Sequence, residues 1–163
     1  ALTQRYQLPD IVASLLLNRG VTLETASNYL NPKLMTLMPD PLKLLDMNKA
    51  VDRVIAALNH KQKIVVYGDY DVDGACSSAL LRQYFRDLNH CSEIYIPDRI
   101  DEGYGANSQA LESIHQKRGQ LVLMVDCGTT AFEPLQHAKD LGLDVIIFDH
   151  HKAEPRIPAV TAL

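Results

Sequence analysis

From residue 63 onward, short apolar segments alternate with segments that have helical spacing. The expected strands cover 64–67, 93–96, 121–125 and 144–148. The expected helices cover 75–88, 108–118 and 132–141, with Ser108 as the N-cap of the second. Continuously apolar strands are buried on both sides, and parallel neighbours need a crossover helix between them. This alternation therefore predicts an α/β domain, a parallel sheet with helices on both faces, over residues 63–163.

The residues before this domain have helical patterns. The expected helices cover 9–19, 22–30 and 46–59. Gly20 is expected to end the first of them and Thr22 to cap the second, and a proline-rich loop, 32–41, follows. The fold prediction is a Rossmann-like parallel sheet, residues 63–163, preceded by a helical N-terminal lead, residues 1–62.

Three aspartates follow the first expected strand closely: Asp69, Asp71 and Asp73. Neighbouring anions repel one another, and burying them without a partner costs more still, so divalent cations are the least costly partners. The same string opens an EF-hand calcium loop, but that loop needs Glu at its twelfth position, where this chain has Leu80. An acidic turn in solvent is the other alternative, and the buried strand in front of it disfavours that.

Further metal-binding residue types follow two later strands. Asp126 follows 121–125, and Asp149-His150-His151 follows 144–148. Ligands of open parallel sheets bind outside the carboxyl ends of the strands, so these segments are expected to converge on one edge. Carboxylates with imidazoles suit Mn²⁺, or Mg²⁺, better than Zn²⁺, and several of them indicate two ions that share a carboxylate. Such a pair favours hydrolysis of a phosphoester or phosphoanhydride.

The two histidines are expected to point in different directions, so that one binds metal and the other faces a substrate. Asp149 is expected to accept a ring N–H and fix the tautomer. The simpler alternatives are a polar loop for the histidine segment and a turn or cap role for Asp126. Cys127 has no base near it in the sequence, and it is interpreted as a small core residue.

One further segment, Pro97 to Asn107, follows the second strand at the same edge. Arg99 offers a planar donor fork for phosphate. Tyr104, followed by Gly105, is placed to stack on a base. The alternative is a flexible loop that binds no ligand.

Composition excludes few function classes. The formal net charge is −4, but five of the acidic residues are the aspartates assigned to metals, and the remaining charge is near balance. No apolar segment approaches the length that spans a bilayer, and the first residues lack the pattern of a signal peptide. Three cysteines without CxxC spacing fit a reducing cytoplasm, so the expected location is cytoplasmic and away from membranes.

Several of these strings match known motifs. GDYDVDGA, VDCGTT and DHH resemble the first three motifs of the DHH phosphoesterase superfamily. IPDRIDEGYGAN and the leader LLLNRGVTLETASNYLNP resemble the RecJ-type single-strand-specific exonucleases of that superfamily. The resemblance implies a metal-dependent 5′→3′ exonuclease that releases mononucleotides from single-stranded DNA in recombination and repair. It also implies protein partners such as a helicase or a single-strand-binding protein.

Roles for single residues follow from motif matching. The resemblance implies that the ligands of two Mn²⁺ or Mg²⁺ ions are Asp71, Asp73, Asp126 and His150. Asp126 would bridge the ions, and Asp69 and Asp149 would support the ligands. His151 would face the scissile phosphate and stabilise its developing charge, while a water activated by the ions would be the nucleophile. The residues implied to be catalytic are His151, Asp126 and Asp73.

The chain departs from the family pattern in two ways. Tyr67 stands where some members carry His, which implies a weaker metal site. A fourth Asp motif and a second domain are expected beyond residue 163, so the chain corresponds to the N-terminal part of a catalytic core, and its activity alone stays open. Two competing functions remain: another DHH hydrolase acting on pyrophosphate, short RNA or cyclic dinucleotides, and a non-catalytic DNA-binding or scaffold module.

Overall fold

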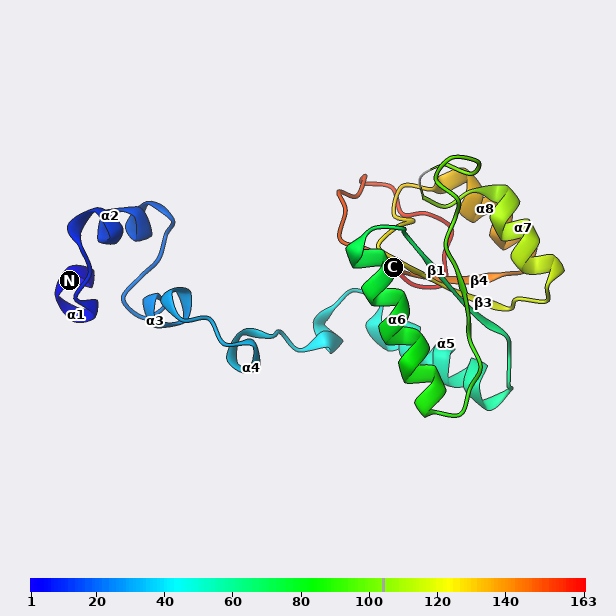
Figure 1. The fold of residues 1–163 in the computed structure, drawn as a ribbon, viewed down its shortest axis with the longest axis horizontal. Coiled ribbons are helices and arrows are strands. Elements are labelled where there is room, and N and C mark those ends of the chain that lie inside the picture. Colours follow the sequence, from blue (N-terminus) through cyan, green and yellow to red (C-terminus); the bar gives the residue numbers. More distant parts are fainter. Residues whose placement is uncertain (104) are drawn as a thin grey trace. The chain divides into compact units, whose positions relative to one another are not determined.

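The fold was analysed in a computed structural model that describes residues 1–103 and 105–163 (Figure 1). The chain forms two compact units, Ala1–Lys43 and Leu44–Leu163, which are described separately. The expected base-stacking residue Tyr104 lies outside the described residues. Across the described part of the chain, none of the helices combines the length and apolar character that crossing a membrane requires.

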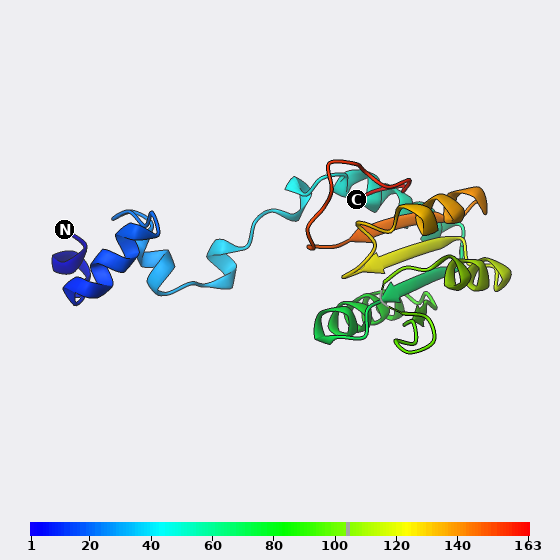
Figure 2. The same ribbon diagram turned by 90° about the horizontal axis from the view of Figure 1, so that it is seen from above.

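The second unit is built on a four-stranded sheet in which all neighbouring strands are parallel. Its strands are β1 (Ile64–Gly68), β2 (Glu93–Tyr95), β3 (Leu121–Val125) and β4 (Asp144–Phe148), in the order β2-β1-β3-β4. Figure 2 shows the larger strands side by side with their arrowheads toward one edge. The prediction of a parallel α/β sheet is confirmed.

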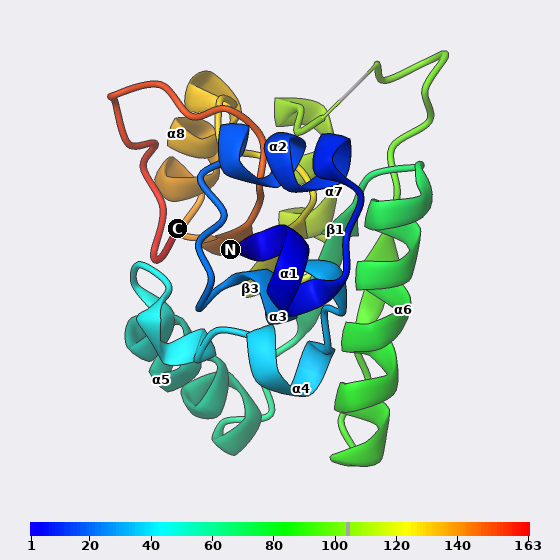
Figure 3. The same cartoon turned by 90° about the vertical axis from the view of Figure 1, so that its left-hand side faces the viewer.

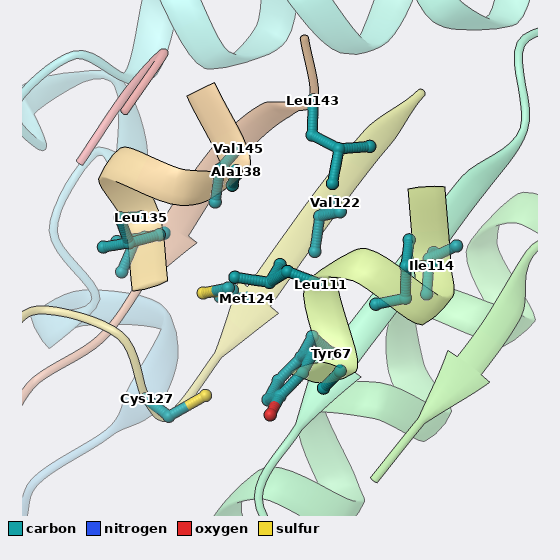
Figure 4. Close-up of a cluster of buried hydrophobic side chains, with 13 residues drawn as sticks. Tyr67, Leu111, Ile114, Val122, Met124, Cys127, Leu135, Ala138, Leu143 and Val145 are labelled. Carbon is teal, nitrogen blue, oxygen red and sulfur yellow. The ribbon is translucent and has the colours of Figure 1, made fainter. Parts of the chain in front are cut away.

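Two helices cover each face of this sheet (Figure 1 and Figure 3). The helices on one face are α5 (Met47–Asn59) and α6 (Val72–Asp87), and those on the other are α7 (Ser108–Gln116) and α8 (Phe132–Asp140). Successive strand residues point to opposite faces. Val65 and Tyr67 pack under α7 and α8, as Figure 4 shows for Tyr67, whereas Ile64 and Val66 pack against α5 and α6. Because both faces are covered, the two central strands, β1 and β3, are buried over their whole length.

Two helix starts in this unit differ from the predictions. Helix α6 begins at Val72, not at residue 75, because the Asp71 carboxylate accepts the N–H groups of Asp73 and Gly74 and caps the helix. Ser108 is not the N-cap of α7. That cap is Asn107, whose Oδ1 accepts the N–H of Ala110 at 2.7 Å.

The first unit contains α1 (Leu2–Tyr6), α2 (Asp10–Asn18), α3 (Ala26–Leu30), α4 (Leu34–Leu37) and the 3₁₀ helix η1 (Pro41–Lys43). Its small core consists of Leu2, Ala13, Leu16, Val21 and Ala26. Thr22 does not cap a helix at residue 22, because α3 begins only at Ala26. The expected loop 32–41 contains α4. Helix α5, which the sequence grouped with the lead, packs Ala50 and Ala57 on the sheet.

Candidate metal centre

The three strands that carry acidic residues at their ends are in register. Gly68 pairs with Val125, and Val125 pairs with Phe148. Asp69, Asp126 and Asp149 each follow one of these three paired residues directly. The hydrogen bonding of the sheet therefore places three carboxylates in a row at its carboxyl edge, as the sequence predicts.

The side on which the chain adds its next strand changes between β1 and β3. After β1 the chain crosses through α6 to β2, and after β3 it crosses on the opposite face through α8 to β4. The carboxyl ends of β1 and β3 are thus a topological switch point, where α/β sheets form their binding crevices. Asp69 and Asp126 lie at this point.

The segment after β1 folds tightly against the start of α6. Asp69 is buried, and its Oδ1 accepts the N–H of Tyr70 at 2.7 Å. Gly74 lies so close to Asp69 that an added Cβ would come within 2.5–2.7 Å of the Asp69 backbone. This close approach requires glycine and holds the carboxylates of Asp69 and Asp71 at the N-terminus of a helix, where negative charge is favoured.

Two groups of potential metal ligands meet at this edge. Asp69, Asp71 and Asp126 form one, and Asp126, His150 and His151 form the other. In each group, one potential ligand atom per residue lies within 4.8 Å of the others. Asp126 belongs to both groups, which is the arrangement expected of a carboxylate that bridges two cations.

Asp126 is the most constrained residue of the site. Its side chain is 4% exposed, Oδ1 lies 3.1 Å from Nε2 of His150, and Oδ2 has no hydrogen-bond partner among the described residues. Burial, and then the neighbouring Asp71, raise the pKa of this carboxyl. Its backbone has a φ of +63°, which residues other than glycine rarely adopt. A buried carboxylate oxygen without a partner, among other anions, fits a divalent cation.

Asp149 holds His151 in place. Its Oδ1 lies 2.7 Å from Nδ1 of His151, and Oδ2 accepts the hydroxyl of Thr129 at 2.6 Å and the Thr129 N–H at 3.1 Å. Burial alone would raise the pKa of Asp149, but these hydrogen bonds outweigh it and lower the pKa to about 2. The same contact raises the pKa of His151. Sequence reasoning did not identify Thr129, because only the fold brings it to Asp149.

The histidines do not diverge as expected. Their ring centroids lie 4.8 Å apart with a tilt of 40°, and both rings belong to the group around Asp126. With Nδ1 of His151 bonded to Asp149, its Nε2 is the ring atom left to act toward that group. Asp73 is exposed and lies outside both groups among the described residues, with a carboxylate oxygen 3.9 Å from Nε2 of His150.

Replacing Thr129 with Val should destabilise the protein in a pH-dependent way. The loss of the hydroxyl bond to Asp149 is expected to cost about 1–2 kcal/mol in the free energy of unfolding at pH 7. A carboxyl whose pKa is lowered by folding stabilises the fold above its unfolded pKa and loses that contribution as the pH falls through its folded pKa. The deficit should therefore shrink between about pH 4 and pH 2.

Urea unfolding of wild type and variant at several pH values measures this difference. Thr130→Val is the matched control, because Thr130 is exposed and, among the described residues, the threonine that hydrogen-bonds Asp149 is Thr129. A deficit that stays constant down to pH 2 would assign the loss to packing instead.

The loop after β2 contributes Arg99 and Gly105. The Arg99 guanidinium carbon lies 4.9 Å from the centroid of the Tyr70 ring. Tyr70 is the residue between Asp69 and Asp71 in the sequence. The carbonyl of Gly105 accepts the Tyr67 hydroxyl at 3.0 Å. The Tyr67 side chain is buried under α7 and thus holds this loop, and it is absent from both groups of potential ligands.

Cys127 is buried in the core just beyond the end of β3, and its sulfur lies on the side of Tyr67 (Figure 4). Burial, followed by the charges of Asp149 and Asp69, raises its pKa to about 12. At neutral pH the Cys127 thiol is therefore protonated and does not act as a nucleophile. This agrees with its interpretation as a small core residue. All three cysteines are free.

Several known proteins are similar to this chain. The profile described as DHH family, N-terminal domain, matches residues 63–163. The single-stranded-DNA-specific exonuclease RecJ of Bacillus subtilis is 41% identical over 164 residues, which cover 100% of this chain and 21% of the relative. Its namesake from Escherichia coli is 33% identical over 159 residues, 96% of this chain and 27% of the relative. The chain thus spans about a quarter of the length of these relatives.

Solved structures agree with the sequence comparison. A crystal structure of exonuclease RecJ bound to manganese matches with a TM-score of 0.68 and 32% identity, over 77% of this chain and 32% of the other. RecJ from Thermus thermophilus in complex with Mn²⁺ matches with a TM-score of 0.63 and 28% identity, over 77% and 18% of the two chains. Because the family match covers the region that carries all three strand-end motifs, the chain belongs to the DHH family.

Proposed function

We propose that the chain is the metal-binding N-terminal part of a single-strand-specific DNA exonuclease. Its reaction would be 5′→3′ phosphodiester hydrolysis that releases mononucleotides, with two Mn²⁺ or Mg²⁺ ions. The observation that carries this proposal is the buried carboxylate of Asp126, which belongs to both groups of potential ligands. The names of its relatives, single-stranded-DNA-specific exonucleases, support the choice of substrate.

Each of the two proposed ions would have its own set of ligands. One ion would be held by Asp69, Asp71 and Asp126. Asp69 would then be a metal ligand itself, and not only the supporting residue that the motif match implies. The other would be held by His150 and Asp126, and by Asp73 on the solvent side, 3.9 Å from the His150 ring nitrogen. When bound, two divalent cations stabilise the attacking and leaving oxygens of an in-line displacement at phosphorus.

The residues around the proposed ions would orient the DNA and offset the negative charge of its phosphates. Asp149 and Thr129 fix the ring of His151, and the raised pKa of His151 favours a protonated ring that would offset the charge developing on the scissile phosphate. Arg99, over the ring of Tyr70, would bind a DNA phosphate. Contacts of Tyr104 and Gly105 with the DNA stay predictions. A cytoplasmic role in recombination and repair, with a helicase or a single-strand-binding protein as partner, belongs to the same proposal.

Hydrolysis of a 5′-phosphorylated, 3′-labelled single strand with Mn²⁺ tests this proposal. Stepwise shortening from the 5′ end is expected, with a duplex of the same sequence resistant and an Asp71→Ala variant inactive. The duplex control distinguishes an enzyme specific for single strands from one that hydrolyses any phosphodiester. The Asp71→Ala control shows that the activity does not come from a contaminating nuclease.

Two results would contradict the proposal. Faster hydrolysis of pyrophosphate or a cyclic dinucleotide would favour another DHH activity. Binding of the single strand that is unaffected by Mn²⁺ and by Asp71→Ala, without hydrolysis, would favour a DNA-binding module.

A further inference from the structure

One carboxylate fastens the loop that carries Arg99 to the sheet. Glu102 Oε1 accepts the hydroxyl of Tyr95, the last residue of β2, at 2.5 Å. Its Oε2 accepts the N–H of Asp98 at 2.7 Å. One side chain thus bonds the strand end and the beginning of the loop at the same time, using both of its oxygens.

The loop itself, residues 98–103, is closed by short-range bonds. The carbonyl of Asp98 accepts the N–H of Glu102 at 2.8 Å, and Asp98 Oδ1 accepts the N–H groups of Ile100 at 2.8 Å and Asp101 at 3.2 Å. These bonds make the loop a compact turn. Its attachment through Glu102 therefore sets the position of the whole turn, including Arg99.

The attachment point is rigid. The ring of Tyr95 stacks on that of Tyr67 with centroids 5.3 Å apart, and Tyr67 is fully buried. The hydrogen bond from Tyr95 lowers the pKa of Glu102, whereas burial and then Glu102 raise the pKa of Tyr95 to about 12. At neutral pH the carboxylate is therefore ionised and the phenol keeps its proton, which gives a strong charge-assisted bond.

Arg99 is held beside acidic residues without pairing with them. Its guanidinium lies over the Tyr70 ring, and among the described residues it forms no ion pair, although Asp98 and Asp101 are its neighbours in the chain. The carboxylate of Asp98 is engaged by backbone N–H groups of the turn. The guanidinium fork thus keeps donors for an anion at the edge of the metal centre.

We propose that Glu102 is a positioning residue, which sets the place of the Arg99 guanidinium for a DNA phosphate. The role of the phosphate rests on the proposed function, but the positioning itself does not. In this proposal Glu102 acts through geometry, because its two oxygens join the turn to Tyr95.

Two substitutions separate geometry from charge. Glu102→Gln keeps the length of the side chain, and its amide can accept from Asp98 and donate to the Tyr95 oxygen. Glu102→Asp keeps the charge but is one carbon too short to bridge both partners. A positioning role predicts that Gln preserves the place of Arg99 and that Asp does not, whereas a direct electrostatic role predicts the reverse.

The position of Arg99 can be measured without any activity. In NMR spectra, the Nε–Hε resonance of Arg99 should carry a ring-current shift from Tyr70, which Glu102→Asp and Tyr95→Phe reduce and Glu102→Gln largely keeps. Arg156, whose guanidinium carbon lies 4.7 Å from the centroid of the Phe132 ring, is the internal control and should not change. An Arg99 resonance that is unaltered in Glu102→Asp would overturn the proposal.

A double-mutant cycle tests the consequence for DNA. Glu102→Asp and Arg99→Ala should each raise the KM for single-stranded DNA about tenfold, with kcat and Mn²⁺-induced stabilisation unchanged, and the double variant should be no worse than Arg99→Ala. Additive effects, or loss of Mn²⁺ binding in Glu102→Asp, would overturn the proposal. If the NMR shifts respond as expected while Arg99→Ala leaves the affinity for single-stranded DNA unchanged, the role proposed for the DNA phosphate fails and the positioning role stands.

Discussion

Asp126→Asn is expected to abolish Mn²⁺ binding while leaving the metal-free fold at least as stable as wild type. Asp126 belongs to both groups of potential ligands, so its loss would affect both of the proposed ions. Mutating a residue that only orients a metal ligand typically lowers the metal affinity 10–100-fold. Mutating a ligand that both ions share should lower it further. Burial and the charge of Asp71 raise the Asp126 pKa, which means that its ionised form destabilises the metal-free protein at neutral pH. Asn removes that charge and tolerates the positive φ of this position.

Thermal unfolding with and without Mn²⁺ measures both effects. At about 100 times the dissociation constant, a bound ion adds about 2.7 kcal/mol, which should raise the wild-type Tm by roughly 10 °C. The variant should show no shift and an equal or higher Tm without metal. Asp144→Asn is the matched control, because Asp144 begins β4 at the opposite edge of the sheet, where it pairs with Arg53. A normal Mn²⁺ shift in Asp126→Asn would exclude Asp126 as a ligand.

Gly74→Ala should be the most damaging substitution of a single methyl group in the site. The new Cβ would lie 2.5 Å from the carbonyl oxygen and 2.6 Å from the nitrogen of Asp69, and backbone atoms cannot move aside as a side chain can. Helix α6 would have to shift away from β1 and carry the capping carboxylate of Asp71 with it. We expect a loss of about 2–3 kcal/mol in the free energy of unfolding, together with weaker Mn²⁺ binding.

Gly142→Ala separates this collision from the general cost of replacing a glycine. Gly142 has a φ of +76° with nothing within 4 Å of the added Cβ, so its replacement should cost about 1 kcal/mol and leave Mn²⁺ binding unchanged. Denaturant unfolding and Mn²⁺ titration of both variants make the comparison. Equal effects of the two substitutions would contradict the steric explanation.

The sheet and its acidic edge are the parts of the molecule that local sequence patterns predict well. Apolar strands of four to five residues separated by helical segments leave few alternatives to a parallel sheet. Polar residues at strand ends then converge because parallel strands share one carboxyl edge. Asp69, Asp126 and Asp149 could be placed together in this way, without any knowledge of the register that aligns them.

The remaining features depend on contacts that no local pattern encodes. Asn107 and Ser108 are both good capping residues, and only the path of the chain decides that Asn107 caps α7. His151 is bonded to Asp149, and the other oxygen of Asp149 is held by Thr129 from the loop after β3. In the sequence, nothing distinguishes Glu102 from the other acidic residues of its polar loop. Its role follows only from the hydrogen bond with Tyr95 that the fold creates.

The register of β1, β3 and β4 fixes the distances between the acidic residues across the sheet, but not the number of residues between them along the chain. Distances across the sheet between Asp69, Asp126 and Asp149 are set by hydrogen-bonded pairs, and shifting one strand by a single residue would displace its carboxylate by about 3.3 Å. The lengths of chain between them pass through helices and loops that can gain or lose residues without moving the strand ends. Insertions and deletions should therefore accumulate in the crossovers and be absent from these strands, so distant relatives are better recognised by what ends each strand than by the number of residues between motifs.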